Sequence, residues 1–181
     1  MVKLVGVKKR LGGQPVLQGV DLTIPAGKLT TIIGPSGEGK SVLLKHMIGL
    51  LKPDEGQVWV GDVEISRLSG KPLNDVRKRF AMLFQGAALF DSMTVFDNVA
   101  FPLREKLRMR ETEVASRVGG MLEQVGLAGM GHKFPAELSG GMRKRAGLAR
   151  ALVMQPDIVL FDEPTTGLDP LMAKAIHDLI T

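Results

Sequence analysis

The chain has no cysteine, no tyrosine, a single tryptophan and no apolar run long enough to cross a bilayer. The absence of cysteine excludes disulfides, thiolate metal sites and cysteine nucleophiles, and it suits a reducing compartment. The N-terminus, MVKLVGVKKRLGG, also lacks the apolar core of a signal peptide. We therefore expect a protein that is neither secreted nor membrane-spanning.

The charge pattern gives no sign of a nucleic-acid partner. The net charge is +5, but lysine and arginine are spread along the 181 residues, without the aromatic-interleaved basic array typical of nucleic-acid binding. The apolar fraction of 44% and the charged fraction of 24% are those of an ordinary folded domain. A globular protein without a nucleic-acid ligand is the expectation.

The spacing of apolar residues predicts an α/β protein. Strand-like segments separated by Gly and Pro are expected at 3–7, 16–24, 28–33, 56–65 and 158–161. Helical spacing is expected from Ser41 to Leu51, from Thr94 to Pro102, over 114–125 and from Ser139 to Met154. Thr94 followed by Asp97 indicates a capping box, and Ser139 is a good N-cap residue.

A glycine-rich loop carries the first chemical signal. Gly34-Pro35-Ser36-Gly37-Glu38-Gly39-Lys40-Ser41 fits the pattern G-x-x-x-x-G-K-[ST] between a predicted strand and a predicted helix. Such a loop turns backbone N–H groups inward, and the following helix N-terminus adds partial positive charge, so phosphate binds there. Lys40 is expected to reach the β- and γ-phosphates of a nucleotide, and the Ser41 hydroxyl to ligate Mg²⁺.

Two carboxylates follow an apolar strand near the end of the sequence. The segment 158–161 is expected to be a buried strand that delivers Asp162 to the edge of a sheet, where a carboxylate can hold hydrated Mg²⁺. Glu163 is then placed to orient or deprotonate an attacking water. Together with the glycine-rich loop, this pair predicts phosphoryl-transfer chemistry.

The stretch Leu138-Ser139-Gly140-Gly141-Met142 is the third signal. Two glycines in the first turn of a helix cost about 1 kcal/mol each in helix propensity, so bare backbone must serve another purpose. A phosphate that approaches the helix N-terminus from outside would explain them.

The order of these motifs resembles the nucleotide-binding subunit of an ATP-binding cassette (ABC) transporter, over essentially the whole chain. The resemblance implies a P-loop NTPase fold: a RecA-like parallel sheet flanked by helices, an N-terminal antiparallel β-subdomain and an inserted helical subdomain. It also implies an ATPase that uses ATP and Mg²⁺ and pairs head to tail with a second copy of itself, each copy offering its LSGGM segment to the other's nucleotide.

Further residue roles come from the resemblance alone. Gln85 is expected to sense Mg²⁺ and the attacking water, Glu163 to be the catalytic carboxylate, and Asp169 to belong to the loop that links the two nucleotide sites. The domain boundaries expected are 1–85 for the nucleotide-binding core and β-subdomain, 86–155 for the helical subdomain and 156–181 for the return to the core.

Within the family, the segments GAALFDSMTVFDNVAFPLRE and PAELSGGMRKRAGLARAL most resemble ATPases of Mla-type systems. These systems move phospholipids across the bacterial envelope with an MCE-domain lipid-binding partner, and the ATPase lies on the cytoplasmic face of the inner membrane. The alternatives are an importer of a polar solute, an ABC-type ATPase acting on DNA or ribosomes, and an inactive binding cassette.

The chain departs from the family pattern in four places. Leu11 stands where an aromatic residue usually stacks on adenine, and Val42 where a second hydroxyl residue often follows the loop. Glu38 puts a carboxylate into an anion-binding loop, and we expect its side chain to point away from the phosphates. The chain ends at Thr181, before the strand that carries the switch histidine, and His177 does not match that histidine; a C-terminally incomplete cassette with low ATPase activity is therefore expected.

Four of the seven phenylalanines lie between Phe84 and Leu103. The resemblance places this segment beside the groove where a cytoplasmic helix of the membrane permease docks. We expect Phe84 and Phe96 to pack internally, Phe90 to face the permease and Phe101 to be the second candidate for that contact.

Overall fold

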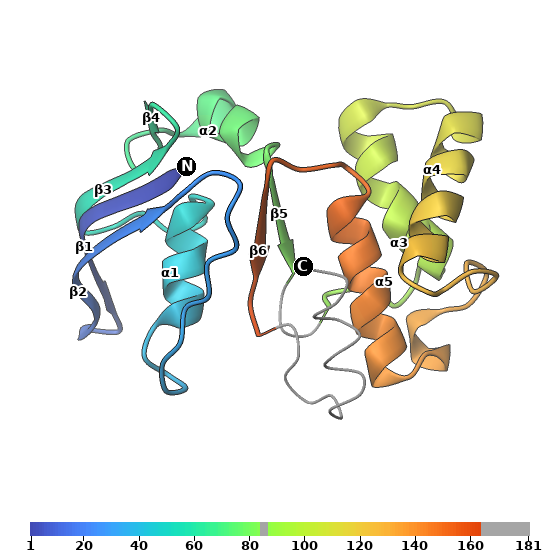
Figure 1. The fold of residues 1–181 in the computed structure, drawn as a ribbon, viewed down its shortest axis with the longest axis horizontal. Coiled ribbons are helices and arrows are strands. Elements are labelled where there is room, and N and C mark those ends of the chain that lie inside the picture. The colour runs from blue at the N-terminus through green and yellow to red at the C-terminus, as the bar shows by residue number, and fades with distance from the viewer. Residues whose placement is uncertain (84–86, 164–181) are drawn as a thin grey trace. The chain divides into compact units, whose positions relative to one another are not determined.

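The computed structural model describes residues 1–83 and 87–163 of the chain. Two compact units are present, one covering Met1–Phe80 and one beginning at Ala81 (Figure 1). The domain boundaries expected at 85 and 155 remain a prediction. None of the helices within the described residues is long and apolar enough to span a membrane.

The first unit is built on a four-stranded antiparallel sheet. Its strands are β1 (Val2–Leu11), β2 (Gln14–Ile24), β3 (Glu55–Val60) and β4 (Val63–Glu64), in the spatial order β2-β1-β3-β4. Gly12 and Gly13, with φ of 55° and 83°, make the two-residue turn between β1 and β2. Such a turn needs positive φ at both central positions, which glycine adopts without strain.

Side chains alternate across this sheet as the period of a strand requires. Val2, Leu4, Val58 and Val60 are buried on one face, whereas Lys3 is exposed on the other. Helices α1 (Lys40–Met47) and α2 (Gly70–Arg77) complete the unit. The Arg77 guanidinium donates to the carbonyl oxygens of Ile48 and Gly49, which ties α2 to the end of α1.

Two predictions for this unit are wrong in part. No strand is assigned at 28–33, where Leu29 and Ile33 are 62% and 90% exposed. A strand forms only where its backbone can hydrogen-bond to a neighbouring strand, and a local sequence pattern does not show whether such a neighbour exists. Helix α1 ends at Met47 rather than near Leu51, because Gly49 turns the chain with a φ of 70°.

The second unit combines a two-stranded sheet with a helical bundle. The strands are β5 (Phe80–Leu83) and β6 (Ile158–Phe161). The helices are α3 (Val95–Pro102), which continues as the π-helical turn η1 (Leu103–Leu107), α4 (Glu111–Gln124), the 3₁₀ turn η2 (Pro135–Glu137) and α5 (Gly140–Leu152). Their apolar faces form one core that includes Val99, Val118, Leu122, Ala146 and Ala149.

Thr94 and Ser139 are confirmed as N-cap residues, but the full capping box predicted at Thr94 is not formed. Thr94 precedes α3, and its Oγ1 accepts a hydrogen bond from the backbone N–H of Asp97 at 3.1 Å. The Asp97 carboxylate accepts from the Thr94 hydroxyl rather than from the Thr94 backbone, so the capping box is incomplete. Ser139 caps α5 in the same way, accepting from the N–H of Met142 at 3.2 Å.

Candidate functional site

The glycine-rich loop runs directly into helix α1. Gly39 is the N-cap residue, with a left-handed φ of 89°, and no side chain caps the helix there. Gly37 has a φ of 87°, so the loop uses conformations that other residues adopt only under strain. The positive end of the α1 dipole is thereby left to an external anion.

The Lys40 side chain lies over the loop that precedes it. Its ammonium donates to the carbonyl oxygens of Gly34 at 2.8 Å and Pro35 at 2.6 Å. An ammonium held at this position can exchange these acceptors for phosphate oxygens. A Glu38 carboxylate oxygen lies 3.8 Å from where a Cβ on Gly34 would stand, so that side chain folds back along the loop. The expectation that Glu38 points away from the phosphates remains a prediction.

The tip of the β1–β2 hairpin packs on the same loop. A Cβ placed at Gly39 would lie 2.8 Å from Val16 Cγ1 and 3.3 Å from the Val16 carbonyl oxygen. Leu11, at the end of β1, is 40% exposed, and Val16 is half-buried. Leu11 is the residue that the family resemblance places beside the adenine base. Val16 is not marked by any sequence pattern, because only the fold brings it against Gly39.

The acidic strand end lies beside the end of β5. Asp162 follows β6, is 9% exposed, and donates its backbone N–H to the Leu83 carbonyl oxygen at 2.9 Å. Glu163 has a φ of 50°, and Ala87 and Ala88, a few residues past the end of β5, have φ of 60° and 49°. Left-handed conformations in non-glycine residues are strained, and such strain gathers at functional sites.

The electrostatics of the strand end involve α5. Burial lowers the pKa of the Lys144 ammonium, and the Glu163 carboxylate opposes that shift. Helix α5 therefore carries a cation, Lys144, within electrostatic range of the predicted catalytic carboxylate.

Within the described residues, nothing explains the glycine at position 140, in the first turn of α5. A Cβ added to Gly140 would meet no atom within 4 Å, and Gly140 has no positive φ. Neither backbone conformation nor close packing therefore requires glycine there. Leu138, just before the Ser139 cap, is 4% exposed and anchors this end of the helix in the core.

Four residues named in the sequence-based predictions lie outside the described residues. They are Phe84, Gln85, Asp169 and His177. Of the predicted Mg²⁺ ligands, the Ser41 hydroxyl and the Asp162 carboxylate supply the oxygen donors that this ion prefers, so the residue types fit. Within 1–83 and 87–163 there is no group of three or more His, Asp or Glu side chains that could hold a metal ion without phosphate.

A partly exposed aromatic pair is formed by Phe90, in the loop before α3, and Phe101, on α3. Phe90 and Phe101 are 43% and 36% exposed, and their ring centroids are 5.1 Å apart. The Arg150 guanidinium lies over the Phe90 ring at 5.6 Å, and burial lowers its pKa. We call Phe90, Phe101 and Arg150 the Phe90 cluster.

Asn98 fixes the loop that carries Phe90. Its side chain is fully buried, accepts from the Phe90 N–H at 2.7 Å and donates to the carbonyl oxygens of Phe90, Met93 and Thr94 at 3.0–3.1 Å. One side chain thus contacts four backbone groups of the turn, and two of these, the carbonyl oxygens of Phe90 and Thr94, also accept the backbone N–H of Met93 and of Asn98. These hydrogen bonds fix the loop backbone in the conformation that leaves the Phe90 side chain partly exposed.

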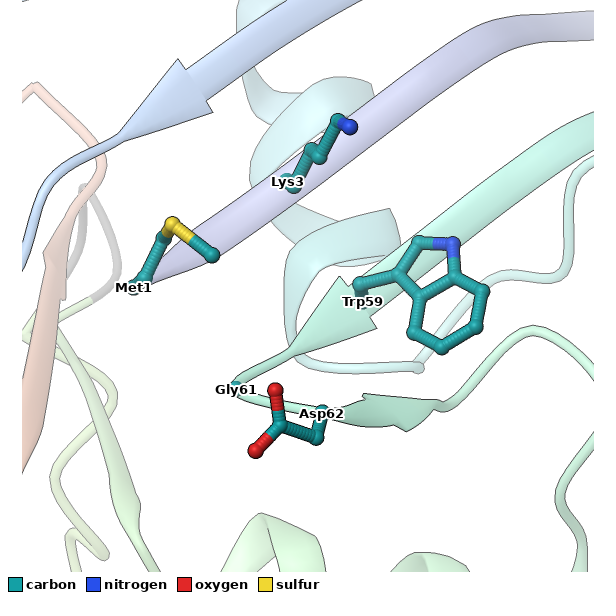
Figure 2. A pocket seen from close by; sticks show the side chains of 5 residues that line it. All are labelled: Met1, Lys3, Trp59, Gly61 and Asp62. Atoms are coloured by element: carbon teal, nitrogen blue, oxygen red, sulfur yellow. The ribbon is translucent and has the colours of Figure 1, made fainter.

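A separate hollow lies on the sheet of the first unit and is lined by Met1, Lys3, Trp59, Gly61 and Asp62 (Figure 2). Lys3 and Trp59 are cross-strand neighbours on β1 and β3, and the indole N–H donates to Gln57 at 3.2 Å. None of these residues belongs to the predicted site, and nothing in their arrangement indicates an occupant.

Comparison with known proteins gives consistent matches. The family model described as ABC transporter matches residues 17–166. The chain is 49% identical over 179 residues to the "Probable ribonucleotide transport ATP-binding protein mkl" of Mycobacterium tuberculosis, covering 99% of this chain and 50% of that protein. It is 44% identical over 181 residues to the "Intermembrane phospholipid transport system ATP-binding protein MlaF" of Escherichia coli, covering 100% and 67%. The chain spans about half the length of the mycobacterial relative.

Solved structures match the fold closely. A dimeric post-hydrolysis state of the ATP-binding cassette MJ0796, bound to ADP and Pi, has a TM-score of 0.91 at 34% identity, covering 99% of this chain and 81% of that one. The protein cbiO1 of Clostridium perfringens, part of a cbiONQ transporter complex, has a TM-score of 0.87 at 31% identity, covering 99% and 71%. These matches confirm the predicted fold class.

Proposed function

The chain belongs to the ABC transporter family, and on this premise we propose that it is the ATP-binding and ATP-hydrolysing subunit of a transporter. The observation that carries the proposal is the phosphate site: an uncapped helix N-terminus at Gly39 with the Lys40 ammonium held over the loop. Both features favour a polyphosphate at this place.

The residues divide the chemistry between binding and water activation. The loop N–H groups and Lys40 hold the β- and γ-phosphates, and Ser41, Asp162 and Gln85 are the residues we propose to hold Mg²⁺. The ion, when bound, neutralises charge on the phosphate oxygens. Glu163 accepts a hydrogen bond or a proton from the attacking water. Leu11 and Val16 offer an apolar wall to the base.

Substitution of Glu163 tests this division. Removing a general base lowers turnover by roughly 10²- to 10⁴-fold. We therefore expect Glu163→Gln to lower the ATPase kcat by at least about a hundredfold and to leave ATP affinity nearly unchanged, whereas Lys40→Ala weakens ATP binding itself. Steady-state hydrolysis and calorimetric titration measure the two effects.

A matched control is Glu123→Gln, which changes an exposed carboxylate on α4 and should alter neither value. Turnover of Glu163→Gln at the rate of the unsubstituted chain would remove Glu163 from the mechanism. Failure of the unsubstituted chain to bind ATP would remove the proposed function itself.

We also propose that a second copy of the chain completes each nucleotide site. Gly140 stands at the N-terminus of α5 with open space beside it, and the Ser139 hydroxyl and the first-turn N–H groups lie there. A phosphate held by a partner's loop can approach this end closely only if no side chain intervenes. The dimeric assembly of the MJ0796 cassette supports this arrangement.

The Phe90 cluster is the proposed docking place of a membrane permease. Among the described residues, the only polar group that Arg150 contacts is the Ala87 carbonyl oxygen, at 3.3 Å. A partner segment that covers Phe90 and Phe101 with apolar side chains would bury aromatic area of the kind that dominates interface energetics.

Permease binding tests this surface. Phe90→Ala and Phe101→Ala should each weaken co-purification of the partner permease, because truncating a central aromatic anchor typically costs 2 kcal/mol or more, roughly thirtyfold. Phe134→Ala is the matched control, since Phe134 is 44% exposed in the same unit but lies outside the cluster. Equal recovery of permease with all three variants would refute the docking role.

We propose phospholipid as the transported substrate, an MCE-domain protein as a further subunit, and the cytoplasmic face of the inner membrane as the location. The support is the likeness of segments 86–105 and 135–152 to Mla-type ATPases and the similarity to a protein named for intermembrane phospholipid transport. The second candidate is a polar solute, because the mycobacterial relative is named for ribonucleotides. The lipid or solute content of the purified transporter distinguishes these two.

A further inference from the structure

The β1–β2 hairpin tip needs support that its own sheet does not provide. Strand β1 runs to Leu11, but its pairing with β3 ends at Lys8 and Glu55. The pairing with β2 shifts register between Lys9 and Arg10. Residues 9–13 therefore extend past the end of β3 on an irregular ladder, and such ends are poorly held.

Asp54 replaces the missing part of the ladder. Continuing the register of β1 and β3 would bring Arg10 opposite Pro53, which has no N–H to donate. Instead, the Arg10 backbone N–H donates to Asp54 Oδ2 at 2.7 Å, and the Asp54 N–H donates to the Lys8 carbonyl oxygen at 2.9 Å. The Asp54 side chain thus holds β1 one residue before Leu11.

The charge of Asp54 is also matched. The Lys9 ammonium donates to Asp54 Oδ1 at 2.7 Å, and the Lys9 side chain is only 17% exposed. Hydrogen bonds from Lys9 and from the Arg10 backbone lower the pKa of the Asp54 carboxyl, so it is ionised at neutral pH. The Arg10 guanidinium in turn donates to the Gly13 carbonyl oxygen across the hairpin turn.

The hairpin thereby contacts the phosphate loop at one point and the segment that follows α1 at another. Val16 packs against Gly39 at the start of α1, and Asp54 holds Arg10 seven residues after the end of α1. The chain between them includes Lys40 and the whole of α1. A shift of the hairpin tip relative to the phosphates would have to break one of these contacts.

We propose that Asp54 is a positioning residue that sets the apolar wall of Leu11 and Val16 at a fixed distance from the phosphate loop. The role rests on the proposed nucleotide function and refines it: Asp54 acts on the base and ribose end of a nucleoside triphosphate and has no part in holding its phosphates. Loss of Asp54 leaves the loop, Lys40 and α1 in place and lets the hairpin tip move.

Comparing the affinities for two ligands distinguishes this positioning role from a general contribution of Asp54 to stability. The probes are ATP, which contacts both ends of the site, and inorganic tripolyphosphate, which contacts the loop only. Base contacts with aromatic side chains are worth about 1–3 kcal/mol, and an aliphatic wall contributes toward the lower end. Asp54→Ala should therefore weaken ATP binding by about three- to tenfold and tripolyphosphate binding by less than about twofold.

Two further variants sharpen the comparison. Asp54→Asn keeps an acceptor for the Arg10 N–H and loses the ion pair with Lys9, so its ATP affinity should lie closer to that of the unsubstituted chain. Asp75→Ala is the control. Asp75 is another exposed aspartate of the first unit; it lies on α2 and pairs with Lys78 at 2.7 Å, and its loss should change neither affinity. Calorimetric titration with each ligand gives both constants.

The outcomes are distinct. A selective loss of ATP affinity in Asp54→Ala, with partial recovery in Asp54→Asn, supports the positioning role. An unchanged ratio of ATP to tripolyphosphate affinity, through no loss or through a parallel loss of both, overturns it. If the unsubstituted chain binds neither ligand, the phosphate site itself fails and the positioning role fails with it. If the unsubstituted chain bound ATP no more tightly than tripolyphosphate, the apolar wall and with it the positioning role would be refuted, while the phosphate site would stand.

Discussion

Gly147 is the residue whose identity the packing of the second unit most clearly requires. It lies inside α5, where glycine is about 1 kcal/mol worse than alanine for helix stability. A Cβ there would lie 2.9 Å from Ala87 Cβ, 3.0 Å from the Ala87 carbonyl oxygen and 3.1 Å from Leu83 Cδ1. The glycine lets α5 touch the segment that follows β5.

We expect Gly147→Ala to destabilise the chain in spite of the better helix propensity. Ala87 has a φ of 60° and its carbonyl oxygen faces the added methyl group, so the neighbour is backbone that cannot rotate away. Overpacking of this kind costs about 1–3 kcal/mol. Urea denaturation should give a lower free energy of unfolding than that of the unsubstituted chain.

Gly120→Ala is the control for this substitution. Gly120 lies inside α4, is exposed, and a Cβ there would meet no atom within 4 Å. The same chemical change should therefore raise the free energy of unfolding by up to about 1 kcal/mol. If both variants shifted stability in the same direction, the close approach of α5 to Ala87 would not constrain the fold.

The helices and strands show which features of the fold a sequence can predict. The starts of α3 and α5 follow from Thr94 and Ser139, because an N-cap is a contact between residues three apart. The strand expected at 28–33 failed because pairing depends on a partner distant in sequence. The phosphate loop could be predicted because its glycines, Lys40 and Ser41 lie within eight consecutive residues, 34–41, and so form a local pattern.

Contacts between distant elements account for what was missed in the site. Arg150 reaches Phe90 across 60 positions in the sequence, and Asp54 reaches Arg10 across 44. Nothing in the residue types of Val16 or Asn98 marks them as parts of a site. Val16 has its role because β2 packs on Gly39, and Asn98 because α3 packs on the loop that carries Phe90. No local sequence pattern encodes either contact.

The molecule as a whole is only half of the proposed catalytic assembly, and Gly140 tests that statement. In the single chain, a side chain at this position would meet open space, and it would replace glycine, which has a poor helix propensity. Gly140→Val should therefore leave the free energy of unfolding within about 0.5 kcal/mol of the unsubstituted value. In the head-to-tail dimer, the same side chain would stand between the α5 N-terminus and the partner's phosphate.

We expect Gly140→Val to abolish ATP-dependent dimerisation without disturbing the monomer. Glu163→Gln should trap the dimer by slowing hydrolysis, so the comparison is made in that background by light scattering with and without ATP. Gly119→Val, on the exposed face of α4 with equal open space, serves as the control and should dimerise normally. A Gly140→Val chain that still dimerises with ATP would mean that no partner phosphate approaches this end of α5, and Gly140 would need another explanation.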